Sequence, residues 1–456
     1  MSSQFIPFDR ESNYLLPPSM NDWLPNNHLA RFIAEMVSQL DLTALKKVYG
    51  GGGSTAYHPE MLLSLLVYGY ATGVFSSRQL ERQTYDSVAF RYLAADMHPD
   101  HDTIAHFRKR FLPELESLFV KVLILAQGMK LLKLGKISLD GTKVHAHASK
   151  HHALSWKHAD KIEKQLRDEV KRLLEMAEEA DRADIPDGMS LPEELSRRKD
   201  RLAAIEKAKT EIKRRAAERD EQAQKEYEKK VSERREREIQ SGQKAKGLEP
   251  KKPESKGPQE KDQVNLTDEE SRIMPVSSGG FEQSYNAQAG VDMKTMLIVT
   301  QHVTQAPNDK EQIEATLDKL DNLPEELGKA KALVADTGYF SQTNVEKCAS
   351  KRIVPYIAWQ RQKHHVSLES RFSGPPPLSA DADAVEKMKR RLQTRSGRKI
   401  YARRKSTVEP VFGIIKAAMG FRQFLLRGLD AVSGEWTLVC MAWNMKRLHQ
   451  LAAGKA

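Results

Sequence analysis

KALVADTG, at residues 331–338, is an apolar run that stops at an aspartate and continues into a Thr-Gly turn. Such a run predicts a buried β-strand with Asp336 at its carboxyl end. KISLDGTKVHAHAS, at residues 136–149, has the same form, because a β-like run reaches Asp140 just before a glycine. Either aspartate alone is more simply explained as a turn residue. Ligands bind at the carboxyl ends of strands in open α/β sheets, however, and these two carboxylates would lie side by side if the two strands were neighbours.

Further β-like runs and helical segments complete an α/β pattern. The other strand runs are residues 285–292, 296–304 and 352–359, and the helical segments are residues 309–320 and 341–350. Three strands followed by alternating helices and strands predict a mixed five-stranded central sheet with flanking helices.

Residues 1–130 are expected to form an all-helical domain. The expected N-cap residues are Ser76 or Ser77 for one helix and Asp102 or Thr103 for the next. This second helix ends in Arg108, Lys109 and Arg110. Short helices, tight turns and a basic last helix favour a helix-turn-helix DNA-binding domain, with these three residues as phosphate contacts. A plain helical bundle is the alternative.

A long charged segment follows the first strand. Between residues 156 and 240 the apolar residues keep helical spacing in two sets, separated by the helix breakers of residues 183–194. This pattern predicts a helical hairpin with one narrow apolar seam, serving as a solvated spacer. Residues 241–262 are rich in Lys, Pro and Gly, which predicts a linker that buries nothing.

The charge balance indicates a polyanionic partner. The chain has 73 Lys and Arg against 62 Asp and Glu, a net charge of +11. Nucleic acid is favoured over a membrane surface, because no apolar stretch approaches the ~20 residues of a membrane span and no secretory signal is visible. Cys348 and Cys440 are expected to be buried thiols, which suits the cytoplasm.

A third acidic residue that could complete a site is Glu409, in the stretch STVEPVFGIIK at residues 406–416. Lys416 lies two helical turns beyond Glu409 and therefore shares its face, while Phe412 and Ile415 would dock the helix. The alternative is a capping box, since Ser406 and Glu409 have the required spacing. The preceding residues, 395–405, form a dense basic run suited to phosphates.

Paired carboxylates on one edge of a sheet repel each other unless a proton or cation lies between them. Mg²⁺ is the obvious cation, because it binds a few carboxylate oxygens together with waters and phosphate. Two Asp, one Glu and a basic helix in a basic protein therefore point to two-metal phosphodiester chemistry.

The motif stretches resemble those of bacterial insertion-sequence transposases of the DDE class. They are LDGTK (139–143), VADTGY (334–339), YARRKSTVEPVFGIIK (401–416), NLTDEESRIM (265–274), YNAQAGVD (285–292) and MGFRQFLLRG (419–428). The resemblance implies an RNase H-like catalytic domain with Asp140, Asp336 and Glu409 as catalytic, metal-binding residues. It further implies two Mg²⁺ ions, with Mn²⁺ able to substitute.

The resemblance also implies residues and partners for DNA binding. The expected DNA-binding residues are Tyr401, Arg403, Arg404 and Lys416, together with Arg108, Lys109 and Arg110. In relatives three residues separate the equivalent arginine and glutamate, whereas four separate Arg404 from Glu409 here, and Lys405 holds the nominal position. The expected partners are the terminal inverted repeats and target DNA, bound by a homodimer or larger assembly at the nucleoid.

The expected organisation has four segments. They are a helical, helix-turn-helix-like domain (1–130), the first part of the RNase H-like domain (131–155), the charged insertion and linker (156–264), and the remainder of the catalytic domain with C-terminal helices (265–456). The expected activity is metal-dependent cleavage at transposon ends and strand transfer into target DNA. The alternatives are an RNase H-like nuclease outside transposition, a His/Asp metal hydrolase using His145 and His147, and an inactive DNA-binding remnant.

Overall fold

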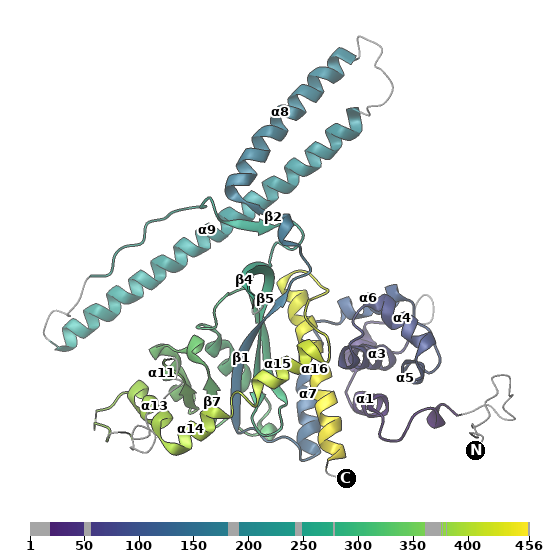
Figure 1. The fold of residues 1–456 in the computed structure, drawn as a ribbon, viewed down its shortest axis with the longest axis vertical. Helices are drawn as coiled ribbons and strands as arrows, with labels where there is room; N and C mark the ends of the chain where they lie inside the picture. Colours follow the sequence, from purple (N-terminus) through teal and green to yellow (C-terminus); the bar gives the residue numbers. More distant parts are fainter. Residues whose placement is uncertain are drawn as a thin grey trace, which may run out of the picture. The chain divides into compact units, whose positions relative to one another are not determined.

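The computed structural model describes residues 19–49, 56–180, 191–241, 249–276, 279–360, 375, 377–379 and 381–454. The chain divides into two compact units (Figure 1). Unit 1 consists of Met1–Val144 and Asn286–Ala456, and unit 2 of His145–Tyr285. The residues that connect the two long helices of unit 2, 181–190, lie outside the described part, as do residues 242–248 of the expected linker.

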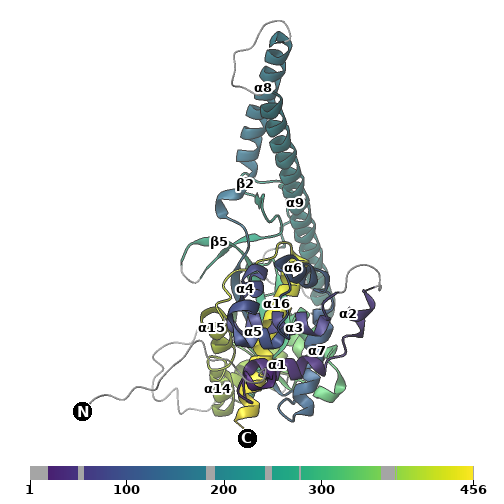
Figure 2. The same ribbon diagram turned by 90° about the vertical axis from the view of Figure 1, so that its right-hand side faces the viewer.

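The N-terminal part of unit 1 is all helical, as predicted (Figure 2). Its helices are α1 (Leu29–Ser38), α2 (Thr43–Lys47), α3 (Pro59–Thr72), α4 (Ser77–Asp86), α5 (Val88–Leu93), α6 (His101–Arg110) and α7 (Leu115–Gly128). Helix α3 is apolar on nearly all sides and is buried as the central helix, in contact with α1 and with the C-terminal helix α16 (Leu429–Ala453). It begins with Pro59 in its first turn and ends at Gly73, whose φ of 87° suits glycine.

One predicted helix cap is confirmed and one is wrong. Ser76 is the N-cap of α4, as expected. The N-cap of α6 is Asp100, not Asp102 or Thr103. The Asp100 carboxylate accepts hydrogen bonds from both the backbone N–H of Thr103 (2.8 Å) and its hydroxyl (2.7 Å). This double contact satisfies an N–H that the helix leaves without a partner, so the helix starts two residues earlier than predicted.

The five predicted strands all form, and in unit 1 they make one mixed sheet. They are β1 (Lys136–His145), β5 (Phe281–Asp292), β6 (Ile298–Thr304), β7 (Ala332–Ala335) and β8 (Val354–Ile357). Their order is β6, β5, β1, β7, β8, with β5 and β6 antiparallel and β1, β7 and β8 parallel. The expected mixed sheet is confirmed, but among the described residues it has six strands instead of the predicted five. A further strand that was not predicted, β4 (Arg272–Pro275), pairs with residues 281–284 of β5 inside unit 2.

Helices flank the sheet and fix its strands. They are α10 (Gln312–Asp321), α11 (Gln342–Ser350), α13 (Ala384–Gln393), α14 (Arg395–Ala402), α15 (Val408–Ala417) and α16. Asn444 lies on the buried face of α16. Its side-chain amide accepts from the Ile298 N–H (2.8 Å) and donates to the Ile298 carbonyl (2.7 Å), as the backbone of a neighbouring strand would. The indole N–H of Trp436 donates to the Gln288 carbonyl of β5 (3.0 Å). Helix α16 is thereby held to the middle of the sheet.

Unit 2 contains the predicted charged hairpin. Helices α8 (Trp156–Ala180) and α9 (Leu191–Ser241) lie side by side in both views (Figures 1 and 2). Their apolar seam is confirmed, with Leu166 facing Ile205 and Ile212 in one buried cluster. This cluster extends to the two-stranded ribbon of β2 (Ala153–Ser155) and β3 (Gln263–Asn265) through Leu154 and Val264.

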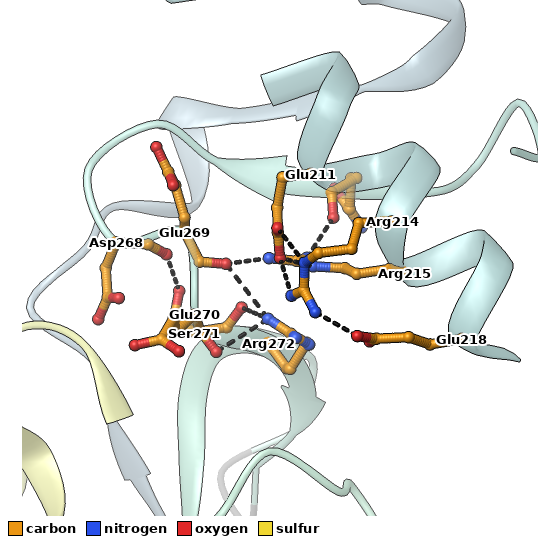
Figure 3. A network of polar contacts seen from close by, with 10 residues as sticks. Glu211, Arg214, Arg215, Glu218, Asp268, Glu269, Glu270, Ser271 and Arg272 are labelled. Atoms are coloured by element: carbon orange, nitrogen blue, oxygen red, sulfur yellow. Dashed lines mark hydrogen bonds and ion pairs between the residues drawn. The ribbon is translucent and has the colours of Figure 1, made fainter. Parts of the chain in front are cut away.

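A network of arginines and carboxylates fixes α9 to the segment between β3 and β4 (Figure 3). Glu211 accepts hydrogen bonds from Arg214 and from Arg215 (2.8 Å), and Arg215 also donates to the backbone carbonyls of Gln263 (3.2 Å) and Glu269. Arg272 donates to the carbonyls of residues 269–271. Charge-assisted bonds to backbone carbonyls order a segment that has few apolar residues of its own.

The described part of the linker, residues 249–262, contains no buried residue, as predicted, but polar contacts hold it to α9. Arg219 of α9 donates to both oxygens of Asp262 (3.0 Å each) and to the Gly257 carbonyl (2.7 Å). Asp220 accepts from the Ser255 hydroxyl at 2.7 Å. Polar contacts with the charged helix thus replace the apolar contacts that the composition lacks.

Both cysteines, Cys348 and Cys440, are buried free thiols, as predicted. None of the described helices is both long enough and apolar enough to cross a membrane.

His302 on β6 is a partly buried histidine, and its surroundings disfavour the charged form of the imidazole. Its Nε2 lies 3.1 Å from the side-chain oxygen of Gln312 on α10. Burial is the main cause that lowers the pKa of His302 to about 4 from 6.5. Between these two pH values the unfolded chain binds more protons than the folded chain, so stability is lost as the pH falls through this window.

We therefore predict that His302→Gln reduces the acid sensitivity of folding. Between pH 7 and pH 5 the wild type should lose about 2 kcal/mol more unfolding free energy than the variant, measured by urea denaturation. The matched control is His158→Gln, which changes an exposed histidine on α8 and should follow the wild type. Equal pH dependence for His302→Gln and wild type would contradict the assignment.

Candidate active site

The sheet brings Asp140 and Asp336 together. Strands β1 and β7 are parallel, and Ser138 pairs with Val334. Two residues further along the same register, Asp140 and Asp336 lie level with each other. Asp336 follows β7 directly, and its carboxylate accepts from the Gly338 N–H at 2.8 Å, which fixes the turn after the strand. Contrary to the prediction, Asp140 does not end its strand, because β1 continues to His145 without a turn. The two aspartates nevertheless lie at the same level on adjacent strands.

Arg404 connects Glu409 to Asp140. Its Nη1 lies 2.8 Å from Asp140 Oδ2 and its Nη2 lies 2.9 Å from Glu409 Oε1. The side chains of Arg404 and Asp140 are only 12% and 16% exposed, whereas Glu409 is 46% exposed. One guanidinium therefore spans two of the three predicted carboxylates, each through a charge-assisted hydrogen bond.

The turn between α14 and α15 explains why Arg404, and not Lys405, enters the site. The backbone N–H of Arg404 donates to the Tyr401 carbonyl (3.0 Å), and the N–H of Thr407 donates to the Arg404 carbonyl (3.0 Å). These successive tight turns accommodate the additional residue before Glu409. Lys405 is left exposed. The wider spacing is therefore compatible with an arginine that contacts the glutamate.

Glu409 is not part of a capping box. The N-cap of α15 is Thr407, whose side chain makes no capping bond, and the Ser406 hydroxyl donates to the Arg403 carbonyl at 3.1 Å. Glu409 lies in the first turn of α15, where a carboxylate is favoured by the helix dipole. The buried side chains of Phe412 and Ile415 dock this helix, as predicted.

Two other acidic residues have structural roles instead. Glu386 forms a capping box with Asp383 at the start of α13. Glu435 is fully buried in α16, where it accepts from the Tyr70 hydroxyl (2.8 Å) and from the N–H groups of Leu425 and Leu426 (2.9 and 3.0 Å). Neither of them contacts the aligned pair of aspartates through a hydrogen bond or an ion pair that the described residues make.

The electrostatics of the site reflect crowded negative charge. Burial raises the pKa of Asp140 to about 6, and although Arg404 opposes this shift, the nearby carboxylates of Asp336 and Asp309 add to it. Burial also lowers the pKa of Lys143, against the attraction of Asp309. A further positive charge would therefore stabilise this edge of the sheet.

Sequence reasoning missed Asp309, which lies in the loop between β6 and α10. Its Oδ1 accepts from the side-chain amides of Asn286 and Gln288, each at 2.7 Å, and lies 3.6 Å from Lys143 Nζ. The position of Asp309 shortly after a predicted strand, residues 296–304, was a signal that could have indicated it. Because β6 is antiparallel to β5, with Thr304 opposite Asn286, the carboxyl end of β6 reaches the same edge of the sheet as Asp140.

The other predicted DNA-binding residues near the site make protein contacts. Lys416 Nζ donates to the Lys143 carbonyl at 2.7 Å, so Lys416 also reaches β1. Arg403 donates to the Met293 carbonyl at 2.7 Å while remaining exposed. Tyr401 is half-buried, and burial raises the pKa of its hydroxyl.

Of the three basic residues on α6, Arg108 lies inside the domain. It is 9% exposed and donates to the Tyr70 hydroxyl (3.2 Å) and the Phe75 carbonyl (3.0 Å). Its guanidinium is therefore committed to the fold and does not suit a phosphate contact. Lys109 and Arg110 are exposed.

In the part of the chain that the structure describes, no group of three or more His, Cys, Asp or Glu side chains is gathered closely enough to hold a metal ion. His145 and His147 thus form no such group, and the His/Asp hydrolase lacks a supporting site there. At the carboxylate edge, the Arg404 guanidinium lies between Asp140 and Glu409.

Comparison with protein families agrees with this architecture. Residues 18–110 match the family model described as Transposase domain (DUF772), and residues 254–445 match Transposase DDE domain. No curated protein and no solved structure matches the chain. The two matched ranges together cover well over half of the chain and include its helical N-terminal part, most of the sheet and α13 to α15. The resemblance noted from the motifs is confirmed, and the chain belongs to the DDE transposases.

Proposed function

We propose that this transposase cleaves DNA strands at the ends of its transposable element and joins them to target DNA, with Asp140, Asp336 and Glu409 as its catalytic carboxylates. The observation that carries the proposal is the shared sheet edge. The register of β1 and β7 aligns the two aspartates, and Arg404 ties Glu409 to Asp140. The transposase DDE match supports this reading of the site.

The three carboxylates are the residues that would hold divalent metal ions, which transposase DDE domains generally use. The donor set fits Mg²⁺, with Mn²⁺ as a substitute, because both prefer carboxylate oxygens and retain water ligands. The raised pKa of Asp140 supports this proposal, because burial, and to a lesser extent the carboxylates of Asp336 and Asp309, disfavour its charge unless a cation is bound. When bound, two such ions would supply a stronger nucleophile and stabilise the leaving oxygen.

The protein's own residues position the reacting groups. Arg404 orients the carboxylates of Asp140 and Glu409, and its charge opposes the rise that burial causes in the pKa of Asp140. Lys416 is held over β1 by its bond to the Lys143 carbonyl, with Arg403 and Tyr401 on the preceding turn. These residues would contact the phosphate backbone on either side of the scissile bond, which orients the DNA without reading its sequence.

DNA-end recognition is proposed for the helical N-terminal part, through a helix-turn-helix-like surface that includes Lys109 and Arg110. The transposase-domain match at residues 18–110 supports this assignment. The proposed partners are terminal inverted repeats and target DNA, bound by a dimer or larger assembly because two ends must be joined. An RNase H-like nuclease outside transposition would cleave without joining ends to target DNA, so a strand-transfer assay separates the two activities.

We predict that Asp140→Asn and Asp336→Asn each reduce cleavage of end DNA by at least about 100-fold, because each variant removes a charged metal ligand. DNA binding should be unchanged or tighter, since a charge that repels phosphate is also removed. Cleavage in Mg²⁺ and filter binding measure the two effects. A variant that cleaves at nearly the wild-type rate would show that its aspartate is not catalytic.

For the third carboxylate, we predict that Glu409→Gln nearly abolishes cleavage and leaves the melting temperature unchanged. Glu386→Gln should keep its activity, because glutamine can retain the capping bond. Glu435→Gln should also keep catalytic chemistry in the folded fraction, with any loss following stability. Measuring rates and melting temperatures of the three variants in parallel decides the matter. An active, normally stable Glu409→Gln enzyme would contradict the assignment.

For DNA binding, we predict that Lys109→Ala and Arg110→Ala each flatten the plot of log K against log salt by about 0.9, the value for one lost phosphate contact. Fluorescence anisotropy with end DNA at several salt concentrations provides the slope. Lys351→Ala is the control, because Lys351 is ion-paired with Asp318 and Asp321 of α10. Unchanged slopes for both α6 variants would move DNA-end recognition away from this helix.

A further inference from the structure

Asp309 is held rigidly beside the proposed catalytic carboxylates. The Asn286 and Gln288 amides of β5 both donate to its Oδ1 at 2.7 Å. Gln288 is itself fixed, because its side-chain oxygen accepts from the buried Tyr339 hydroxyl. The Asp309 side chain is 23% exposed, so a strand-anchored carboxylate faces the site from the β6–α10 loop.

Two glycines show how closely Asp309 approaches the aligned aspartates. A Cβ atom on Gly141 would lie 2.7 Å from Asp309 Oδ1 and 2.1 Å from Gln288 Nε2. A Cβ atom on Gly338 would lie 3.0 Å from Asp336 Oδ1 and 3.7 Å from Asp309 Oδ2. Gly141 directly follows Asp140 within β1, and the Gly338 N–H donates to the Asp336 carboxylate. The backbone at both glycines therefore lies close to Asp309 without an intervening side chain.

Lys143 is the cation that Asp309 holds. Its ammonium lies 3.6 Å from Asp309 Oδ1 and its side chain is 16% exposed. Asp140 and Asp336 also attract this ammonium, but less strongly than Asp309 does. If the Asp309 charge were absent, the nearest carboxylates left to Lys143 would be these two proposed metal ligands. The Lys143 ammonium would then compete with a divalent ion for them.

We propose, on the basis of the function proposed above, that Asp309 is a positioning residue that retains the Lys143 ammonium and so keeps Asp140 and Asp336 available for divalent ions. Asp309 acts through Lys143 and is not itself a ligand. The amides of β5 fix the position of this retaining carboxylate, and the glycines allow it to come this close.

The test is Mn²⁺ binding to the full chain without DNA, measured by isothermal titration calorimetry, so that no turnover is needed. Asp309→Asn retains an oxygen for the two amides but loses the charge, and should weaken Mn²⁺ binding about tenfold, as removal of a supporting residue near a metal site commonly does. Lys143→Met should bind Mn²⁺ more tightly than the wild type. In the double variant, Asp309→Asn should have little further effect, because the competing cation is gone.

Controls separate this inference from the proposed function. Asp318→Asn removes an exposed carboxylate from α10 and should leave Mn²⁺ binding unchanged. Asp140→Asn should abolish it, and wild-type binding by Asp140→Asn would refute the proposed metal site itself. If Asp140→Asn loses binding while Asp309→Asn binds normally, or weakens binding equally with and without Lys143, the positioning role is wrong. If circular dichroism shows that Asp309→Asn does not fold, the Lys143→Met variant decides. Mn²⁺ binding by Lys143→Met that is equal to or weaker than that of the wild type would overturn the inference.

Discussion

The constraint on which the site depends is repulsion between carboxylates that a parallel register forces together. Asp140 within β1 and Asp336 directly after β7 lie at the same level on neighbouring strands, so the sheet spacing holds the two carboxylates close together. A half-buried edge screens charge poorly, so the surrounding chain must supply cations or leave space for them. Arg404 and Lys143 are the two cations that the fold supplies there.

The helix that carries Glu409 depends on the same constraint. Buried apolar residues dock α15 from its first residue, Val408, and the Arg404 bridge in addition fixes the Glu409 side chain in relation to β1. Farther along, Glu435 ties the segment after α15 to Tyr70 of α3. Burial raises the pKa of Glu435, while the backbone N–H of Leu426 and the Tyr70 hydroxyl oppose this shift. Helix α15 and the N-terminal helices therefore belong to one compact unit.

Features determined by local patterns could be predicted from the sequence, whereas features determined by distant partners could not. The position of Asp336 directly after its strand follows from an apolar run and a turn, and the hairpin seam follows from helical spacing. The position of Asp309 depends on amides of β5, which a local pattern does not reveal. Arg108 lies in a basic run, which predicts an exposed side chain, but its guanidinium is buried and donates to the Tyr70 hydroxyl and the Phe75 carbonyl. For Glu409, the spacing from Ser406 was compatible with a capping box, but the turn at Arg404 to Thr407 prevents Ser406 from acting as the N-cap.

The sheet tolerates the charged insertion because the two ends of the insertion pair with each other. Ala153 pairs with Asn265 and Ser155 with Gln263, so the chain leaves and returns through one short antiparallel ribbon. The seam of the hairpin packs against this ribbon through Leu154 and Val264, giving unit 2 a core of its own. The entropic cost of closing a loop grows only with the logarithm of its length, so a long excursion costs little more than a short one. The insertion requires only that the part where it leaves and rejoins the sheet be stable. The ribbon, the apolar seam and the Arg215 contacts to Gln263 and Glu269 stabilise this part.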